Sequence, residues 1–133
     1  MRISQADYNK IVRDWPKTSP TASPPAPGKA MNKTEARYAR DVLEPRRLVG
    51  EIREYGFQVE GLWLADGLYY YPDFRVITAD WRVEFHEVKG GFVREDSWIK
   101  FKMAVRGHPY PFVLAKWERK TGWTTELFVR EDR

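Results

Sequence analysis

Hydrophobic and polar residues follow two different periods along this chain of 133 residues. From Asn32 onward, apolar residues recur every three or four positions, which predicts a helix. Asn32 and Glu35 have the spacing of a helix N-cap and its capping-box acid. Pro45 should end or kink this helix near Glu44. The apolar stripe consists of Ala36, Tyr38, Ala39, Val42 and Leu43.

After this helix the pattern shortens to the period of strands, interrupted by turn signals at Asp66-Gly67 and at 78–80. Helical spacing returns over Glu95–Arg106, where Trp98, Phe101 and Met103 are among the apolar residues. The predicted strands are Glu51–Leu64, Leu68–Ile77, Trp81–Lys89, Tyr110–Glu118 and Thr124–Val129.

The predicted order is therefore helix, three-strand meander, helix, strand, strand. Because the second helix allows a crossover between strands, we expect an α/β fold with a mixed β-sheet flanked by helices. Residues 32–133 would form this domain. Residues 1–31 would form an N-terminal arm, with a short helix over 1–15 and a Pro-rich linker over 16–28.

Composition removes several classes of protein. The chain has no Cys, which excludes disulfide frameworks, Cys-ligated zinc and thiol nucleophiles. No apolar run reaches the length of a membrane helix and no signal-peptide core is visible, so we expect a soluble, cytoplasmic protein. The formal net charge is +4, with a slightly acidic middle between basic ends. This distribution suits a protein that binds a polyanion and also holds a cation.

The predicted strand over 81–89 begins as a core strand and ends with charges. Trp81, Val83 and Phe85 share one face with Glu87 and Lys89. A three-residue turn at 78–80 would pair Ile77 with Trp81, which places Asp73 opposite Phe85 and diagonal to Glu87 on the same face.

Two interpretations of this face remain open at this point. Two carboxylates that converge repel each other, and a divalent cation would relieve the repulsion. Alternatively, Asp73, Glu87 and Lys89 form an exposed strand face with a cross-strand salt bridge.

The spacing resembles the PD-(D/E)XK signature of restriction-endonuclease-like nucleases. The core of the match is Pro72-Asp73 followed by Glu87-Val88-Lys89. The wider frame, over about residues 32–129, resembles short phage and prophage endonucleases related to phage-type Holliday-junction resolvases. It adds Glu35, Gly50-Glu51-Ile52, Tyr70-Tyr71, Phe74, Gly90 and a helix with Lys100 and Lys102.

The resemblance implies roles for individual residues. Asp73 and Glu87 would be metal ligands, with the Val88 carbonyl as a further oxygen ligand, and Lys89 would orient the attacking water or stabilise charge. Oxygen ligands favour Mg²⁺, with Mn²⁺ as a substitute, in one or two ions per site. Glu35 would either bind a metal or its water, or only cap its helix; these two roles are expected to exclude each other.

The implied function is a Mg²⁺-dependent endodeoxyribonuclease that hydrolyses phosphodiester bonds in branched or structured DNA, in a phage recombination, repair or packaging context. A homodimer is expected because junction resolution needs two cuts, and no nucleotide cofactor is expected. If the protein is phage-encoded, it would act in the host cytoplasm. Candidate DNA contacts are Lys100, Lys102, Lys116, Arg119 and Lys120.

Two other classes of protein remain as alternatives. One is a non-catalytic nucleic-acid-binding module on the same fold, and the other is an interaction protein whose charged strand end is a salt bridge. Neither His86 nor His108 is expected to act as a catalytic base, and the run Tyr69–Tyr71 is expected to pack on the sheet.

Overall fold

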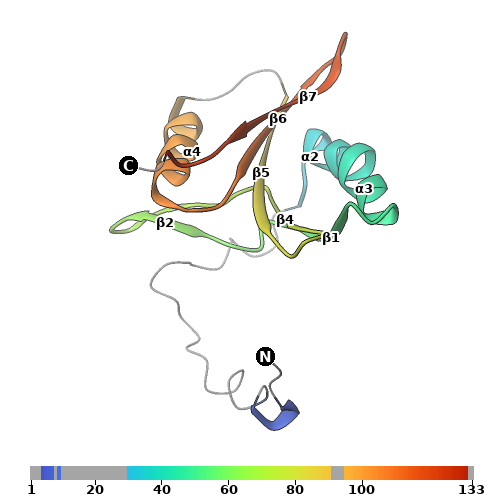
Figure 1. Cartoon of the computed structure of the whole chain (residues 1–133). Coiled ribbons are helices and arrows are strands. Elements are labelled where there is room, and N and C mark those ends of the chain that lie inside the picture. The colour runs from blue at the N-terminus through green and yellow to red at the C-terminus, as the bar shows by residue number, and fades with distance from the viewer. Residues whose placement is uncertain (1–3, 8, 10–29, 91–94, 132–133) are drawn as a thin grey trace.

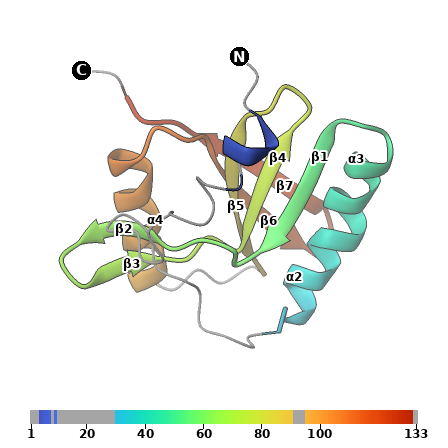
Figure 2. The same ribbon diagram turned by 90° about the horizontal axis from the view of Figure 1, so that it is seen from below.

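The computed structural model describes residues 4–7, 9, 30–90 and 95–131, which form an α/β fold around a mixed five-stranded sheet with the strand order β1-β4-β5-β6-β7 (Figures 1 and 2). A separate two-stranded sheet pairs β2 with β3. The strands are β1 (Ile52–Phe57), β2 (Leu62–Ala65), β3 (Leu68–Tyr70), β4 (Phe74–Thr78), β5 (Val83–Lys89), β6 (Phe112–Glu118) and β7 (Gly122–Phe128). The helical segments are α2 (Lys33–Tyr38), the π-helical η1 (Ala39–Leu43), α3 (Glu44–Leu48) and α4 (Glu95–Gly107).

The first helical segment begins at the predicted cap but continues past the predicted end. Asn32 and Glu35 form a complete capping box. The helix does not stop at Glu44, because η1 shifts the hydrogen-bond register by one residue and the Glu44 N–H donates to the Ala39 carbonyl. Pro45 therefore falls in the first turn of α3, where its missing N–H leaves no bond unmade.

Two of the predicted strands are each divided in the structure. The segment over 51–64 separates into β1 and β2 at Gln58, whose φ of 48° cannot continue a strand. The segment over 68–77 separates into β3 and β4 around Pro72, which has no N–H for a sheet hydrogen bond. As a result, β1 pairs directly with β4, and the β2–β3 hairpin is an insertion between them.

The hairpin between β4 and β5 has its turn one residue later than predicted. Ile77 pairs with Val83 and Phe74 with His86, so Trp81 lies in the turn with a φ of 66° and is not paired. The predicted pairing of Ile77 with Trp81 is wrong by two positions along the partner strand. A shift of two residues preserves the face of every side chain, so Asp73 remains on the same side as Glu87.

The rest of the main sheet follows the expected order. β5 and β6 are parallel and are connected through α4, while β6 and β7 form an antiparallel hairpin. Without the inserted hairpin, the order along the chain is α-β-β-β-α-β-β, as predicted.

Helices cover both faces of the sheet and divide the core in two (Figure 2). On one face, Tyr38 and Leu43 pack against Phe74, Val76 and other residues of the sheet. On the other face, Phe101 and Ala104 of α4 pack against further strand residues, and the β2–β3 hairpin joins this cluster. The strand residues under α4 include Phe85, Phe112 and Leu114.

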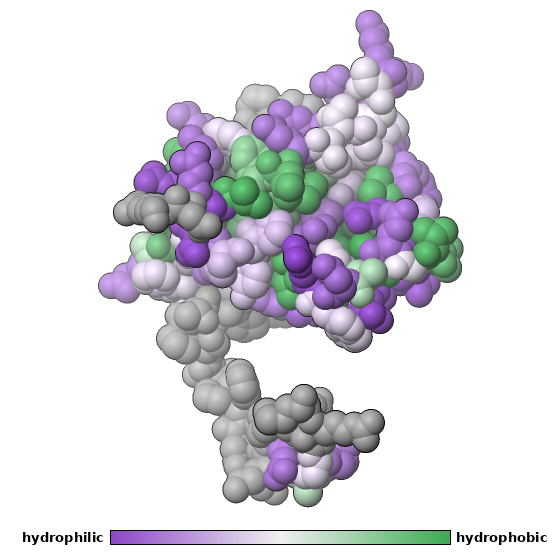
Figure 3. All heavy atoms as spheres, in the orientation of Figure 1, coloured by the Kyte–Doolittle hydropathy of each residue, from purple (hydrophilic) through white to green (hydrophobic). Residues whose placement is uncertain are grey.

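The surface is mixed in polarity, and a hydrophobic group lies over the end of α3 (Figure 3). Leu48 and Val49, at this end, are 71% and 72% exposed. Most of the predicted N-terminal arm, including the Pro-rich linker, lies outside the described residues. Within the described residues, no helix is both long and apolar enough to cross a membrane.

Candidate functional site

Three carboxylates from different elements meet at one end of β5. Glu35 comes from α2, Asp73 immediately precedes β4, and Glu87 lies near the end of β5. Their exposed fractions are only 6%, 7% and 7%. The β4–β5 register continues to place Asp73 across from Glu87, closer than the diagonal arrangement expected from the sequence.

Asp73 is fixed by main-chain contacts on both sides. The Val88 N–H donates to Asp73 Oδ2 at 2.8 Å. The Gln58 N–H donates to the Asp73 carbonyl oxygen, also at 2.8 Å. The left-handed turn at Gln58 and the imino acid Pro72 thus hold the chain where it enters β4.

Glu87 has a partner on each carboxylate oxygen. The Tyr70 hydroxyl donates to Oε2. The Lys89 ammonium lies 3.2 Å from Oε1, and its side chain is 16% exposed. Lys89 is two residues further along β5, so the two side chains share a face as the alternation predicted.

Glu35 caps its own helix. Its Oε1 accepts from the Asn32 N–H at 2.8 Å, and its own N–H donates to Asn32 Oδ1 at the same distance. The charge of this carboxyl group also contributes to the raised pKa of Asp73. The capping role of Glu35 is thus confirmed, and its role toward a metal stays a prediction.

Burial and mutual repulsion control the protonation of this cluster. Burial raises the pKa of Asp73 to about 9, the negative charge of Glu87 adds to the shift, and the Val88 N–H opposes it. Burial also raises the pKa of Glu87, against the opposing effects of Lys89 and Tyr70. The pKa of Tyr70 is raised well above its usual value by burial and by the charge on Glu87.

This arrangement contradicts one of the two interpretations of the charged face. Asp73 and Glu87 are buried, so the face is not an exposed strand surface. The salt bridge between Lys89 and Glu87 exists, but it leaves Asp73 with no cation beside it among the described residues. Since a buried acid without a cation must hold a proton or an unpaired charge, it costs free energy and weakens the fold as the pH rises.

The donor set is composed of oxygens, which suits a hard divalent cation. Asp73 and Glu87 are the two carboxylates best placed to hold one, with Glu35 behind Asp73. Among the described residues, no group of three or more His, Cys, Asp or Glu side chains forms a ready-made metal site. Each carboxylate has at least one oxygen engaged by Asn32, Val88, Tyr70 or Lys89.

The five candidate DNA contacts lie in different places. Lys116 is the register partner of Lys89 on the neighbouring strand. Lys100 and Lys102 are two positions apart on α4, so they cannot face the same groove, and the Lys102 ammonium lies over the Trp98 ring at 5.6 Å. Arg119 and Lys120 belong to the turn of the projecting β6–β7 hairpin (Figure 1).

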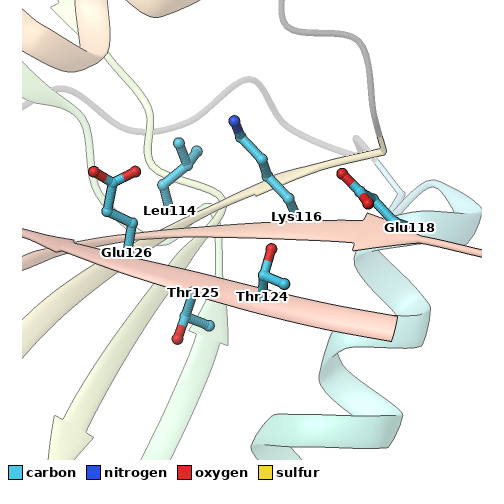
Figure 4. A pocket seen from close by; sticks show the side chains of 6 residues that line it. All are labelled: Leu114, Lys116, Glu118, Thr124, Thr125 and Glu126. Carbon is cyan, nitrogen blue, oxygen red and sulfur yellow. The ribbon is translucent and has the colours of Figure 1, made fainter. Parts of the chain in front are cut away.

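A shallow hollow of about 400 Å³ lies on the β6–β7 ribbon and includes Lys116 in its lining (Figure 4). Leu114, Lys116, Glu118 and Glu126 extend to one side of the ribbon, while Thr125 points to the other. Leu114 is the register partner of Glu87. The hollow therefore continues the face that carries the acidic cluster.

Neither histidine lies in the acidic cluster, whereas one tyrosine contacts it. His86 is buried on the opposite face and bonded to Tyr38, and His108 follows α4 with its Nε2 2.8 Å from the Trp63 carbonyl oxygen. Tyr70 packs on the core as expected, but its contact with Glu87 was not foreseen. Nothing in the run Tyr69–Tyr71 distinguishes the hydroxyl that reaches the acidic cluster.

Comparisons with protein-family models, curated proteins and solved structures give no match for this chain.

Proposed function

We propose that this protein is a divalent-metal-dependent DNA endonuclease of the PD-(D/E)XK type. The observation that carries the proposal is the convergence of Glu35, Asp73 and Glu87, with Lys89 beside them, in a buried cluster that has too few cations. The order α-β-β-β-α-β-β of the main sheet and the sequence spacing from Asp73 to Lys89 support it.

Asp73 and Glu87 would hold the ion, with the Val88 carbonyl and Glu35 as further oxygen ligands. Mg²⁺ or Mn²⁺ bound there would activate a water and neutralise charge in the transition state. The proton that Asp73 holds in the metal-free chain must leave before its carboxylate can serve as a ligand.

The remaining residues position these groups. Tyr70 holds one oxygen of Glu87 and fixes the orientation of its carboxylate. The Lys89 ammonium is available to orient the attacking water or to stabilise charge on the phosphate, once its contact with Glu87 loosens. The Val88 N–H keeps Asp73 directed toward Glu87.

The substrate follows from the resemblance rather than from the geometry. We propose branched or structured DNA in a phage recombination, repair or packaging setting, cut by a homodimer in the cytoplasm. The basic segments at the two ends of the chain would favour binding to the phosphate backbone.

Labelled linear, nicked and four-way-junction DNA, incubated with the protein in Mg²⁺, would test this function. We expect cleavage that EDTA abolishes and that Glu87→Gln lowers by at least about 100-fold. Glu54→Gln is the matched control, because it removes the same charge from an exposed position on β1.

Two results would contradict the proposal. The first is the absence of cleavage on all three substrates, and the second is a Glu87→Gln variant as active as its parent. If DNA binding persisted without metal and without cleavage, the chain would instead be a non-catalytic nucleic-acid-binding module.

A further inference from the structure

The hollow on β6 and β7 and the acidic cluster belong to two adjacent rows of one sheet face. In the first row, Glu87 is the partner of Leu114, and Leu114 is the partner of Glu126. In the second row, Lys89 is the partner of Lys116, and Lys116 is the partner of Thr124. Paired residues in a sheet point to the same side, so the hollow begins one strand away from the proposed reaction centre.

The charges of the hollow do not suit a phosphate. Lys116 is the single cation in the lining, while Glu118 and Glu126 are both acidic. A phosphodiester placed here would meet one positive and two negative groups, which would not offset the free-energy cost of its desolvation. The hollow therefore suits a ligand that has N–H donors for the carboxylates and also an acceptor oxygen for the Lys116 ammonium.

The charged side chains of the hollow are available to a ligand. In the described part of the chain, the side chains of Lys116 and Glu126 form no salt bridge or hydrogen bond with other residues. Both side chains extend to the same side of the ribbon (Figure 4). Leu114 also lines the hollow and forms its apolar floor. Leu114 is 3% exposed, so the floor is firmly packed on the core below.

Among the nucleobases, guanine has the matching edge. It places a carbonyl acceptor beside two N–H donors, whereas thymine and cytosine each offer one donor group and adenine lacks the carbonyl. A lysine donates well to guanine O6, and a carboxylate accepts from ring and exocyclic N–H groups. This edge is accessible only when the base is unpaired.

We propose that this hollow binds the Watson–Crick edge of an unpaired guanine, with Lys116 on O6 and Glu126 on the N1–H and N2–H donors. The proposal rests on the proposed function, because it places this base near the scissile phosphate. β7 lies two strands from β5, which is about 10 Å. The base would thus belong to a nucleotide close to the one cleaved, and branched DNA supplies unpaired bases of this kind.

A binding experiment without metal tests the assignment separately from cleavage. Fluorescein-labelled oligothymidylates, each with one central guanine, inosine, 2-aminopurine or adenine, are titrated with the protein in EDTA. We expect the guanine oligonucleotide to bind about 10-fold more tightly than the adenine one. Inosine lacks the N2 amine, so it removes one of the two donors to Glu126. 2-Aminopurine lacks O6 and also the N1–H donor, so it removes the acceptor for Lys116 together with the other donor to Glu126.

Two variants connect the analogues to the residues. Glu126→Ala should make guanine and inosine bind equally, and Lys116→Met should reduce the difference between guanine and 2-aminopurine to the part contributed by the N1–H donor. Glu131→Ala is the matched control, since it removes an exposed acid outside the hollow and should leave the order of affinities unchanged. Thermal unfolding of each variant verifies that it is folded.

Three outcomes would overturn the inference: no preference for guanine, a preference that both variants retain, or an equal loss for all oligonucleotides in Lys116→Met. The last result would mean that Lys116 contacts phosphate. Cleavage without guanine preference would refute this inference alone, whereas guanine preference without any cleavage would refute only the proposed nuclease activity.

Discussion

Two buried polar clusters lie on opposite faces of β5, and they differ in how their polar and charged groups are paired. On one face, Tyr38 OH lies 2.6 Å from His86 Nδ1, and His86 Nε2 lies 2.9 Å from Glu84 Oε1. Every buried polar atom of this Tyr38–His86–Glu84 chain has a partner. On the other face, burial raises the pKa of Asp73 and of Glu87, and only Glu87 has a cation beside it among the described residues.

The difference indicates what each cluster is for. A satisfied polar chain joins α2 to β5 and stabilises the fold. A cluster of buried acids with too few cations destabilises the metal-free fold, and under the proposed function a bound divalent ion would offset this cost. The first cluster also aligns the second, because Tyr38 lies one helical turn after Glu35 and His86 adjoins Glu87.

The largest effect is expected from Lys89→Met, which removes the cation that partners Glu87. The free energy of unfolding of the metal-free protein should fall by about 2–4 kcal/mol at pH 8. Urea unfolding with and without Mg²⁺ measures this loss, and the ion should restore part of it. An unchanged unfolding midpoint would show that Lys89 does not compensate the buried charge.

Tyr38→Phe tests the balanced cluster. Without the hydroxyl, His86 Nδ1 is buried with no partner, so the free energy of unfolding should fall by about 1–3 kcal/mol. Tyr55→Phe is the matched control, because it removes a hydroxyl bonded to Glu44 at a partly exposed site and should cost less. Equal losses in the two variants would argue against a special contribution from the buried chain.

Asp73→Asn should have the opposite sign and raise the stability of the metal-free protein by about 1–2 kcal/mol at pH 8. The folded-state pKa of Asp73 is raised from 3.8 to about 9, so the folded protein binds the proton more tightly than the unfolded chain. The stability contributed by this proton is complete below pH 3.8 and is lost as the pH rises through about 9.

The measurement for this variant is the unfolding midpoint as a function of pH in EDTA. The wild-type protein should lose stability between pH 4 and 9 more steeply than Asp73→Asn. Asp66→Asn, in the exposed β2–β3 turn, is the control and should keep the wild-type slope. Parallel pH profiles for wild type and Asp73→Asn would contradict the assigned protonation.

The smallest effect is expected from Gly90→Ala, at the position after Lys89. An added Cβ would lie 3.1 Å from Thr34 Oγ1, so the Thr34 side chain must shift by a few tenths of an ångström. The expected loss is about 0.5–1 kcal/mol in urea unfolding, and Thr34→Ala in the same chain should recover it. Gly107→Ala, which meets nothing within 4 Å, should be tolerated.

Most of the helices and the turn at Asp66-Gly67 could be predicted because their signals are local. A capping box, an apolar stripe and a two-residue turn each depend on neighbours in sequence. The division of the first two predicted strands could not be predicted in this way. The φ of Gln58 is imposed by the contact between its N–H and the Asp73 carbonyl, which is distant in sequence.

The site was predicted in part for a similar reason. Strand alternation placed Glu87, Lys89 and Asp73 on one face, and an error of two residues in register leaves this face unchanged. An error of one residue would have moved Asp73 to the face of His86. The burial of Glu35 and the contact of Tyr70 depend on how α2 and the inserted hairpin pack, and local sequence patterns do not contain this information.

The most direct test of the account is a crystal structure of the protein with Mn²⁺, using the anomalous signal of manganese. We expect a peak between Asp73 and Glu87, about 2.0–2.3 Å from a carboxylate oxygen of each residue. A map with no such peak at saturating Mn²⁺, and with Glu35, Asp73 and Glu87 still in their metal-free contacts, would contradict the central claim.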